Sequence, residues 1–264
     1  MHGAVAALAA ALVAPPAAAS GVEISWSADV PATVTALSAW LVLEGTMEGS
    51  VGSRCGICSG PGRVDRWFRS WLLGRDPGAA SIASDAMLGG VAGLVSLSEI
   101  LIVRLGGEPW MDLAEDLMLV TEAVATTAFV TVGIKISVRR TRPYAFFGAG
   151  DPLYDEGSRD VTGFPSLHTS LAFALAASAA TVSFLRHRPA APWIAASGAI
   201  LALATGTLRI VADRHYFSDV AAGLLIGAAV GVLVPLVHAL PLGGARVSIA
   251  IAPAPGGAGV AGVF

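Results

Sequence analysis

The chain has 264 residues, of which 55% are hydrophobic and only 13% are charged, and its mean hydropathy is +0.71. Soluble domains carry roughly twice that charged fraction, so the composition excludes an ordinary soluble globular protein and predicts an integral membrane protein with several spans. A net charge of -3 without a long basic run excludes nucleic acid as an expected partner.

The two ends of the chain differ in composition from the segment between them. The first 20 residues are mostly Ala, Val and Leu and end in small residues. They resemble a signal peptide without its usual basic residue, and a low-complexity tail is the open alternative. We therefore predict a signal-like N-terminus at 1–24, a membrane domain at 25–241 and a Gly/Ala/Pro-rich tail at 242–264. The tail is expected to form a short strand or a disordered appendage.

The membrane domain is predicted to be an all-α polytopic bundle of about six spans. The first apolar segment, 32–43, is weak because a full span needs roughly 20 residues. Stronger apolar segments follow at 86–103, 113–134, 170–185, 192–208 and 220–240. Within the last one, Gly223, Gly227 and Gly231 recur four residues apart on one helical face. This pattern predicts that a neighbouring helix approaches closely.

The segment between the first two spans contains an amphipathic stretch and both cysteines. In residues 54–75, Trp67 and Trp71 recur at helical spacing among arginines, which suits either an interfacial helix or a solvated connector packed on the bundle. Cys55 and Cys58 are too few to close a zinc site, which takes four ligands. We interpret them as a structural pair, or as a disulfide if this loop faces an oxidising compartment.

Charged residues outside the functional pattern receive structural interpretations. Glu99 and Glu122 lie inside apolar segments, where charge is costly, so they are expected to face the bundle interior. Arg139, Arg140 and Arg214 are interpreted as membrane-surface charges.

Three polar clusters lie at the ends of long spans, at 135–143, 164–170 and 208–219. Successive spans alternate in direction, so the end of the third span, the start of the fourth and the turn between the fifth and sixth share one face. The clusters are therefore expected to form one site for an anionic group at the membrane surface. Arg186 and Arg188, in the turn on the opposite face, favour that face as cytoplasmic.

The clusters resemble the signature of the type 2 phosphatidic acid phosphatase superfamily, which reads Lys-x6-Arg-Pro, Pro-Ser-Gly-His and Ser-Arg-x5-His-x3-Asp. The matching residues are Lys135, Arg142 and Pro143, then Pro165, Ser166 and His168, then Arg209, His215 and Asp219. Two positions depart from the signature: Leu167 replaces its glycine and Leu208 its second serine.

The resemblance implies a role for each matching residue. His215 would be the nucleophile that forms a phosphohistidine, Asp219 would orient its ring, and His168 would act as acid and then as base. The substrate phosphate would be bound at Lys135, Arg142, Ser166, Leu167 and Arg209. This chemistry requires no metal and no other cofactor.

The expected function is hydrolysis of a lipid phosphate or diphosphate monoester of the phosphatidate, phosphatidylglycerophosphate or polyprenyl diphosphate type. The expected partners are this lipid and the membrane, and the expected place is a bacterial cell membrane with the site facing the periplasm or exterior. Because Leu167 replaces glycine, a catalytically weak lipid-phosphate-binding or scaffold member is the alternative. A vanadate-dependent haloperoxidase-like enzyme is a weaker alternative, since those relatives of the signature are soluble.

Overall fold

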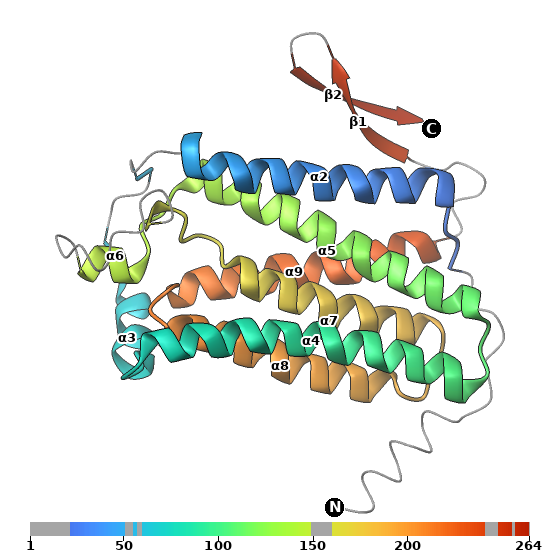
Figure 1. Ribbon diagram of the computed structural model, residues 1–264, viewed down its shortest axis with the longest axis horizontal. Coiled ribbons are helices and arrows are strands. Elements are labelled where there is room, and N and C mark those ends of the chain that lie inside the picture. The colour runs from blue at the N-terminus through green and yellow to red at the C-terminus, as the bar shows by residue number, and fades with distance from the viewer. Residues whose placement is uncertain are drawn as a thin grey trace, which may run out of the picture.

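The structure is a computed structural model that describes residues 22–50, 55–56, 60–148, 160–240, 248–254 and 257–263. Its long helices lie side by side along one direction (Figure 1). The helices are α2 (Trp26–Ser50), α3 (Arg63–Leu72), α4 (Pro77–Gly106), α5 (Trp110–Val138), α6 (Pro143–Phe147), α7 (Leu167–Leu185), α8 (Ala191–Val211) and α9 (Phe217–Ala239). Most of the predicted signal-like segment lies outside the described residues.

The prediction of an all-α membrane bundle is confirmed. Among the described residues, 5 helices are long and apolar enough to cross a membrane, namely α4, α5, α7, α8 and α9. Each of them contains one of the five stronger apolar segments, except that the last segment extends one residue beyond the end of α9. Helix α2 covers the weak first segment and packs along α5, but it is not one of the five.

Local sequence signals explain where α4 begins and ends. Asp76 is the N-cap, its side chain accepts a hydrogen bond from the backbone N–H of Ala79 at 2.9 Å, and Pro77 opens the first turn. The helix ends at Gly107, whose φ of 72° is a left-handed conformation that glycine adopts without strain.

Helix α7 is the centre of the bundle and packs against α4, α5, α8 and α9. Its approach to α9 depends on the three glycines. A Cβ added to Gly223, Gly227 or Gly231 would lie 2.6, 2.1 or 2.8 Å from a backbone oxygen of α7 or of its N-cap. The predicted close approach is therefore confirmed, and it brings the N-terminal ends of α7 and α9 together.

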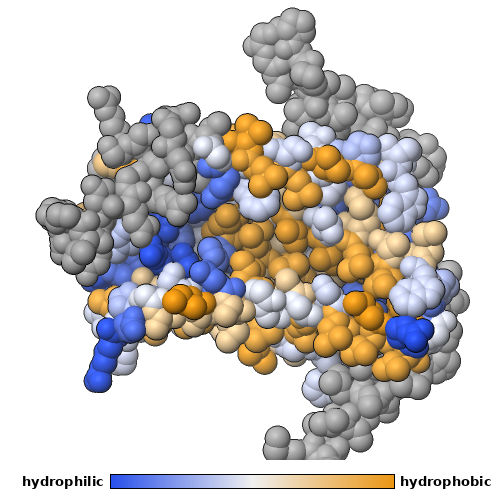
Figure 2. All heavy atoms as spheres, in the orientation of Figure 1, coloured by the Kyte–Doolittle hydropathy of each residue, from blue (hydrophilic) through white to orange (hydrophobic). Residues whose placement is uncertain are grey.

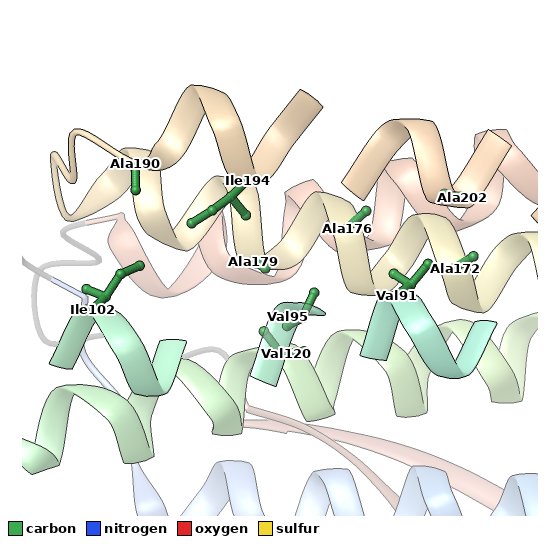
Figure 3. Packing of buried hydrophobic residues seen from close by; sticks show 10 residues of the cluster. All are labelled: Val91, Val95, Ile102, Val120, Ala172, Ala176, Ala179, Ala190, Ile194 and Ala202. Atoms are coloured by element: carbon green, nitrogen blue, oxygen red, sulfur yellow. The ribbon is translucent and has the colours of Figure 1, made fainter. Parts of the chain in front are cut away.

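The apolar interior is built from small side chains. Ala172, Ala176 and Ala179 of α7 pack with Val91 and Val95 of α4 in the main buried cluster (Figure 3). Alanine and valine let the helices approach closely, because dispersion contacts and packing, and not water exclusion, hold helices together in lipid. On the outside, Figure 2 shows hydrophobic residues over the middle of the bundle and hydrophilic residues gathered at the end where α3 and α6 lie.

Helix α3 lies at that hydrophilic end. Asp65 is buried, and Phe68 stacks on Phe217 of α9 with ring centroids 3.9 Å apart, while Trp67 and Trp71 are exposed. The helix therefore packs on the bundle through one face and presents tryptophans on the other.

The predicted tail contains strands. Strands β1 (Ser248–Ala254) and β2 (Gly257–Val263) pair antiparallel, with Ser248 opposite Val263. Of the two alternatives for this segment, the structure has the strand.

Candidate functional site

The three polar clusters meet at one end of the bundle, as predicted. The directions of the helices bring them together, since α5 and α8 end there while α4, α7 and α9 begin there (Figure 1). The residues carried to this end are Lys135, Arg142, Ser166, His168, Arg209, His215 and Asp219. The site is thus assembled from helix ends far apart in the chain.

His215 lies in the turn between α8 and α9, with only 2% of its surface exposed. Its Nδ1 is 2.7 Å from the carbonyl oxygen of Gly163. Because a carbonyl only accepts, Nδ1 carries the proton, and the lone pair is on Nε2. Burial lowers the pKa of His215 well below its ordinary value, and the charges of Arg142 and Lys135 lower it further. The ring is therefore neutral and has the tautomer that a nucleophile at Nε2 requires.

Asp219 contacts His215 less directly than the family signature suggests. Its Oδ2 is 3.7 Å from Nδ1, too far for a hydrogen bond, and instead accepts from the backbone N–H of Tyr216 at 2.8 Å. The Gly163 carbonyl is the direct hydrogen-bond partner of the ring. Asp219 fixes the first turn of α9 and hence the loop that carries His215.

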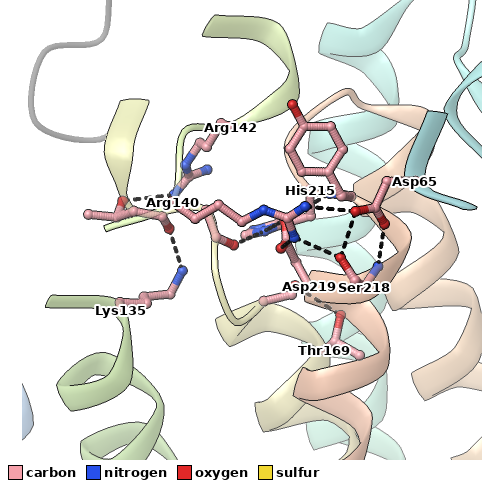
Figure 4. A network of polar contacts seen from close by, with 12 residues as sticks. Asp65, Lys135, Arg140, Arg142, Thr169, His215, Ser218 and Asp219 are labelled. Atoms are coloured by element: carbon pink, nitrogen blue, oxygen red, sulfur yellow. Dashed lines mark hydrogen bonds and ion pairs between the residues drawn. The ribbon is translucent and has the colours of Figure 1, made fainter. Parts of the chain in front are cut away.

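Arg140 is a network residue, and its interpretation as a membrane-surface charge was wrong. It donates to Asp219, to the Ser218 hydroxyl at 2.7 Å and to Asp65 at 2.7 Å (Figure 4). Although burial opposes its charge, Asp219 and Asp65 raise the pKa of Arg140. The tether to α3 requires Asp65, and no spacing in the sequence relates Asp65 to Arg140.

Three basic side chains lie near His215. Lys135 is buried, and its Nζ donates to the carbonyl oxygen of Thr162 at 2.7 Å. Arg142 is 3.4 Å from the Thr162 hydroxyl, and Arg209 donates to the Ser84 hydroxyl at 2.9 Å. Burial has the largest effect on the pKa of His215, and the charges of all three residues lower it further. Such a convergence of positive charge favours an anionic ligand.

Leu167 does not point its side chain among these cations. The side chain packs in an apolar cluster with Val132, Val161 and Ile136. The neighbouring Ser166 is fully buried and accepts a hydrogen bond from the Thr169 hydroxyl at 2.9 Å, so its own hydroxyl proton can serve a ligand. The side chain that replaces the glycine therefore stabilises the loop from outside the site.

Asp85 of α4 is a site residue that the sequence pattern did not reveal. Its Oδ1 lies 2.8 Å from Nε2 of His168 and 3.4 Å from Nη1 of Arg209. A carboxylate accepts only, so Nε2 of His168 carries a proton here. The signature has no position in α4, and only the packing of α4 against α7 and α8 brings Asp85 to the site.

Cys55 lies at this same end of the bundle. It is disulfide-bonded, whereas Cys58 lies outside the described residues. The adjoining Gly56 donates its backbone N–H to the carbonyl oxygen of Arg139 at 2.9 Å. The cysteine loop is thereby tied to the segment between Lys135 and Arg142.

Comparison with known proteins points to one family. Residues 116–240 match the model of the PAP2 superfamily. A curated relative, the lipid A 1-phosphatase of Porphyromonas gingivalis, is 45% identical over 71 residues, which make up 27% of this chain and 14% of that protein. The family match runs from α5 to the end of α9 and includes Lys135, His168, Arg209 and His215. Asp65 and Asp85 lie before it.

Proposed function

We propose, from the premise that residues 116–240 of this chain belong to the PAP2 superfamily, that the protein is a membrane phosphatase that hydrolyses a lipid phosphate or diphosphate monoester. The named activity of the bacterial relative supports a phosphorylated lipid as substrate. Lipid A is therefore a candidate beside phosphatidate, phosphatidylglycerophosphate and polyprenyl diphosphate.

One observation carries this proposal. A buried, neutral imidazole leaves its Nε2 lone pair within the field of Lys135, Arg142 and Arg209. A phosphate monoester brings close to two negative charges, which these cations neutralise while they hold the oxygens of the in-line transition state. Burial and the same cations favour the unprotonated form of His215 before substrate arrives, so the nucleophile is ready.

In the first step, Nε2 of His215 attacks phosphorus, and a P–N bond forms as the P–O bond to the lipid breaks. The departing oxygen takes a proton from the imidazolium form of His168, which leaves that ring neutral. The proton on Nδ1 of His215 stays in its hydrogen bond to Gly163 throughout.

In the second step, a water molecule gives a proton to the neutral His168 and attacks phosphorus. The P–N bond breaks, inorganic phosphate leaves, and both imidazoles return to their starting states. The carboxylate of Asp85, 2.8 Å from Nε2 of His168, accepts a hydrogen bond from that ring and holds it in place for both proton transfers.

We place the site on the extracytoplasmic side of a bacterial membrane. The disulfide-bonded Cys55 lies at the site's end, and disulfides persist in oxidising compartments. Protease access to the segment at 149–159 tests this orientation. Cleavage in cells whose outer membrane is permeabilised and whose inner membrane is intact supports it. Cleavage confined to inverted inner-membrane vesicles contradicts it.

The decisive experiment measures phosphate release in detergent from the four lipids named above. We compare the wild type with His215→Asn, whose amide N–H still reaches toward Gly163 but offers no nucleophile. The rate should fall by about 10⁴-fold or more, as when other catalytic nucleophiles are removed. His187→Asn, at an exposed histidine, is the matched control. Equal rates for wild type and His215→Asn on every lipid would refute the proposal.

A phosphohistidine has its own chemical signature. Wild-type protein quenched during turnover of a ³²P-labelled lipid should carry label that is stable in base and lost in acid. Label that instead survives acid would contradict a histidine intermediate while leaving the phosphatase activity intact.

A further inference from the structure

A cavity of about 580 Å³ opens beside the site. Its walls come from the end of α3, the loop into α4, α6 and the turn between α8 and α9. The lining residues that bear on the argument are Arg69, Arg75, Arg214, Asp213, Tyr144 and Phe147. The volume falls within the range of roughly 300–1,000 Å³ that holds small organic ligands, so the cavity has room for a headgroup as well as for an ion.

The charge of the cavity is positive, because three arginines line it against one aspartate. Arg69 is fixed in place: its Nε and Nη2 donate to the two oxygens of Asp213 at 2.6 and 2.7 Å, and its Cζ lies 3.9 Å from the ring centroid of Phe147. Among the described residues, no acceptor engages Nη1 of Arg69 or the guanidinium of the exposed Arg75. Nη1 of the anchored Arg69 and the exposed guanidinium of Arg75 can therefore donate to the oxygens of a phosphate or a carboxylate.

The cavity shares its loops with the catalytic site. Asp213 and Arg214 immediately precede His215, and Tyr144 follows the Arg142–Pro143 pair. The two loops are joined by a hydrogen bond from the Tyr144 N–H to the Asp213 carbonyl at 3.2 Å. One stretch of chain thus presents His215 to the reacting phosphate and lines the cavity with the residues before it.

The floor of the cavity is held close to the end of α8. The backbone N–H of Gly74 donates to the carbonyl oxygen of Val211 at 3.0 Å, and a Cβ at Gly74 would lie 2.8 Å from the Val211 side chain. Pro77 and Gly78, in the first turn of α4, also line the cavity. The Asp76 carboxylate caps the start of this helix, so the arginines supply the positive charge of the cavity.

We infer that this cavity binds a second anionic group of the substrate headgroup, of phosphate type, while the first phosphate reacts at His215. This inference rests on the proposed function and deepens it. The preferred substrates are then lipids whose headgroup carries a further negative charge beyond the phosphate that is removed. Lipids with a single phosphate use the catalytic cations alone.

Arg75→Gln is the informative change, because Arg75 is exposed and lies outside the catalytic cluster. The variant is assayed with two lipids in uncharged detergent micelles. One is phosphatidylglycerophosphate, which has a second phosphate, and the other is phosphatidate with the same acyl chains. The KM for the first should rise roughly tenfold, the effect of losing about one charge-assisted hydrogen bond, while the KM for the second stays unchanged. Arg66→Gln, at an exposed arginine of α3, is the control. Equal effects of Arg75→Gln on both lipids, or no effect on either, would overturn the inference.

A neighbouring lipid is the other source of the same chemistry, and the assay separates it. Phosphatidylglycerol added to the micelles should leave the phosphatidate rate unchanged. An acceleration that occurs in the wild type and disappears in Arg75→Gln would assign the cavity to a neighbouring lipid and overturn the substrate assignment.

A binding measurement tests the cavity without turnover. Inorganic phosphate is titrated calorimetrically into Arg209→Gln, whose catalytic anion site is weakened, and into Arg209→Gln/Arg75→Gln. We expect the double variant to bind phosphate about tenfold more weakly. Identical binding would refute the cavity site. Absence of phosphate release from every lipid, by contrast, refutes the proposed function.

Discussion

The two ends of the helix bundle both contain buried charges, but their charges are arranged oppositely. At the end away from the site, Arg188 contacts Glu99 at 2.8 Å and Asp116 at 2.6 Å, and it also pairs with Glu108. Arg186 reaches Asp116 at 2.6 Å and contacts two further carboxylates, Glu115 and Asp112, at 2.9 and 3.4 Å. Five carboxylates surround two arginines there.

At the site the excess is of positive charge. Lys135 donates to a neutral carbonyl, and Arg209 lies 3.4 Å from the exposed carboxylate of Asp85. Buried charges that pair within the protein stabilise its structure, whereas converging cations gain most when an external anion arrives. The comparison therefore separates a structural cluster from the candidate ligand site.

This comparison also changes the meaning of Arg186 and Arg188. The sequence suggested that they mark a cytoplasmic turn, but both are buried and hold α4, α5 and α7 together. The same cluster supplies the interior partner expected for Glu99. For Glu122 the nearest partner is His238, 3.5 Å away.

The largest effect is expected from Arg188→Gln, which leaves Glu99, Glu108 and Asp116 without their shared cation. Breaking a buried ion pair costs about 3–5 kcal/mol, so the melting temperature in detergent should fall sharply. Arg104→Gln, at an exposed arginine of α4, should leave it unchanged. Partial recovery in Glu99→Gln/Arg188→Gln would identify the stranded charge as the cause. An unchanged melting temperature for Arg188→Gln would show that this end is not the structural one.

Arg209→Gln should have the opposite signature. The rate of phosphate release should fall by about 10²–10³-fold, as when one preorganised donor is removed, because the transition state loses a cation. The melting temperature should stay near the wild-type value, since glutamine can still donate to Ser84 and a repelling positive charge is removed. A loss of stability as large as that of Arg188→Gln would erase the distinction between the two ends.

The depressed pKa of His215 predicts a smaller effect, on stability in acid. Unfolded histidine titrates near pH 6.5, so below that pH the unfolded chain gains a proton that the folded chain refuses. The stabilising effect of the neutral ring is fully present above about pH 6.5 and is lost as pH falls, by up to about 1.4 kcal/mol per unit. Thermal melts between about pH 7.5 and 4.5 cover the range in which an ordinary histidine titrates. As the pH falls, the melting temperature of His215→Asn should decrease less steeply than that of the wild type. Parallel slopes would contradict a neutral, buried His215.

The smallest effect on catalysis is expected from Leu167→Gly, which restores the glycine of the family signature. Because the leucine side chain packs with Val132 and Val161, its removal should bring no gain in the rate of phosphate release. It should instead cost roughly 1–2 kcal/mol of stability, through lost apolar burial and the greater backbone freedom of glycine. A clear acceleration would show that Leu167 hinders the site and would favour the weak-member hypothesis.

Much of the fold could be predicted because a lipid environment strongly restricts the sequence of a membrane-spanning helix. A span must be long and apolar, so the five strong segments could be delimited from hydropathy alone. The glycines at 223, 227 and 231 predicted a close neighbour because only small residues allow helix backbones to approach. The signature positions then followed from spacing and from the alternation of spans.

The roles of Arg140 and Asp85 could not be predicted in this way. Each acts through partners more than 70 positions away in sequence. Arg140 contacts Asp65. Asp85 contacts His168 and Arg209. A single charged residue near a helix end looks the same whether it faces lipid headgroups or a buried carboxylate. The cavity beside the site escaped prediction for the same reason, since its walls come from four separate segments.

By itself, the sequence determined that the chain forms a membrane helix bundle and that Lys135, Arg142, Ser166, His168, Arg209, His215 and Asp219 belong at one end. Hydropathy and span direction suffice for this, because both are properties of the chain taken in order. Only the tertiary structure decided that Gly163 orients His215, that the Leu167 side chain lies outside the site, and that carboxylates enclose Arg186 and Arg188. These features depend on distances of a few ångströms between side chains on different helices, and packing alone sets those distances.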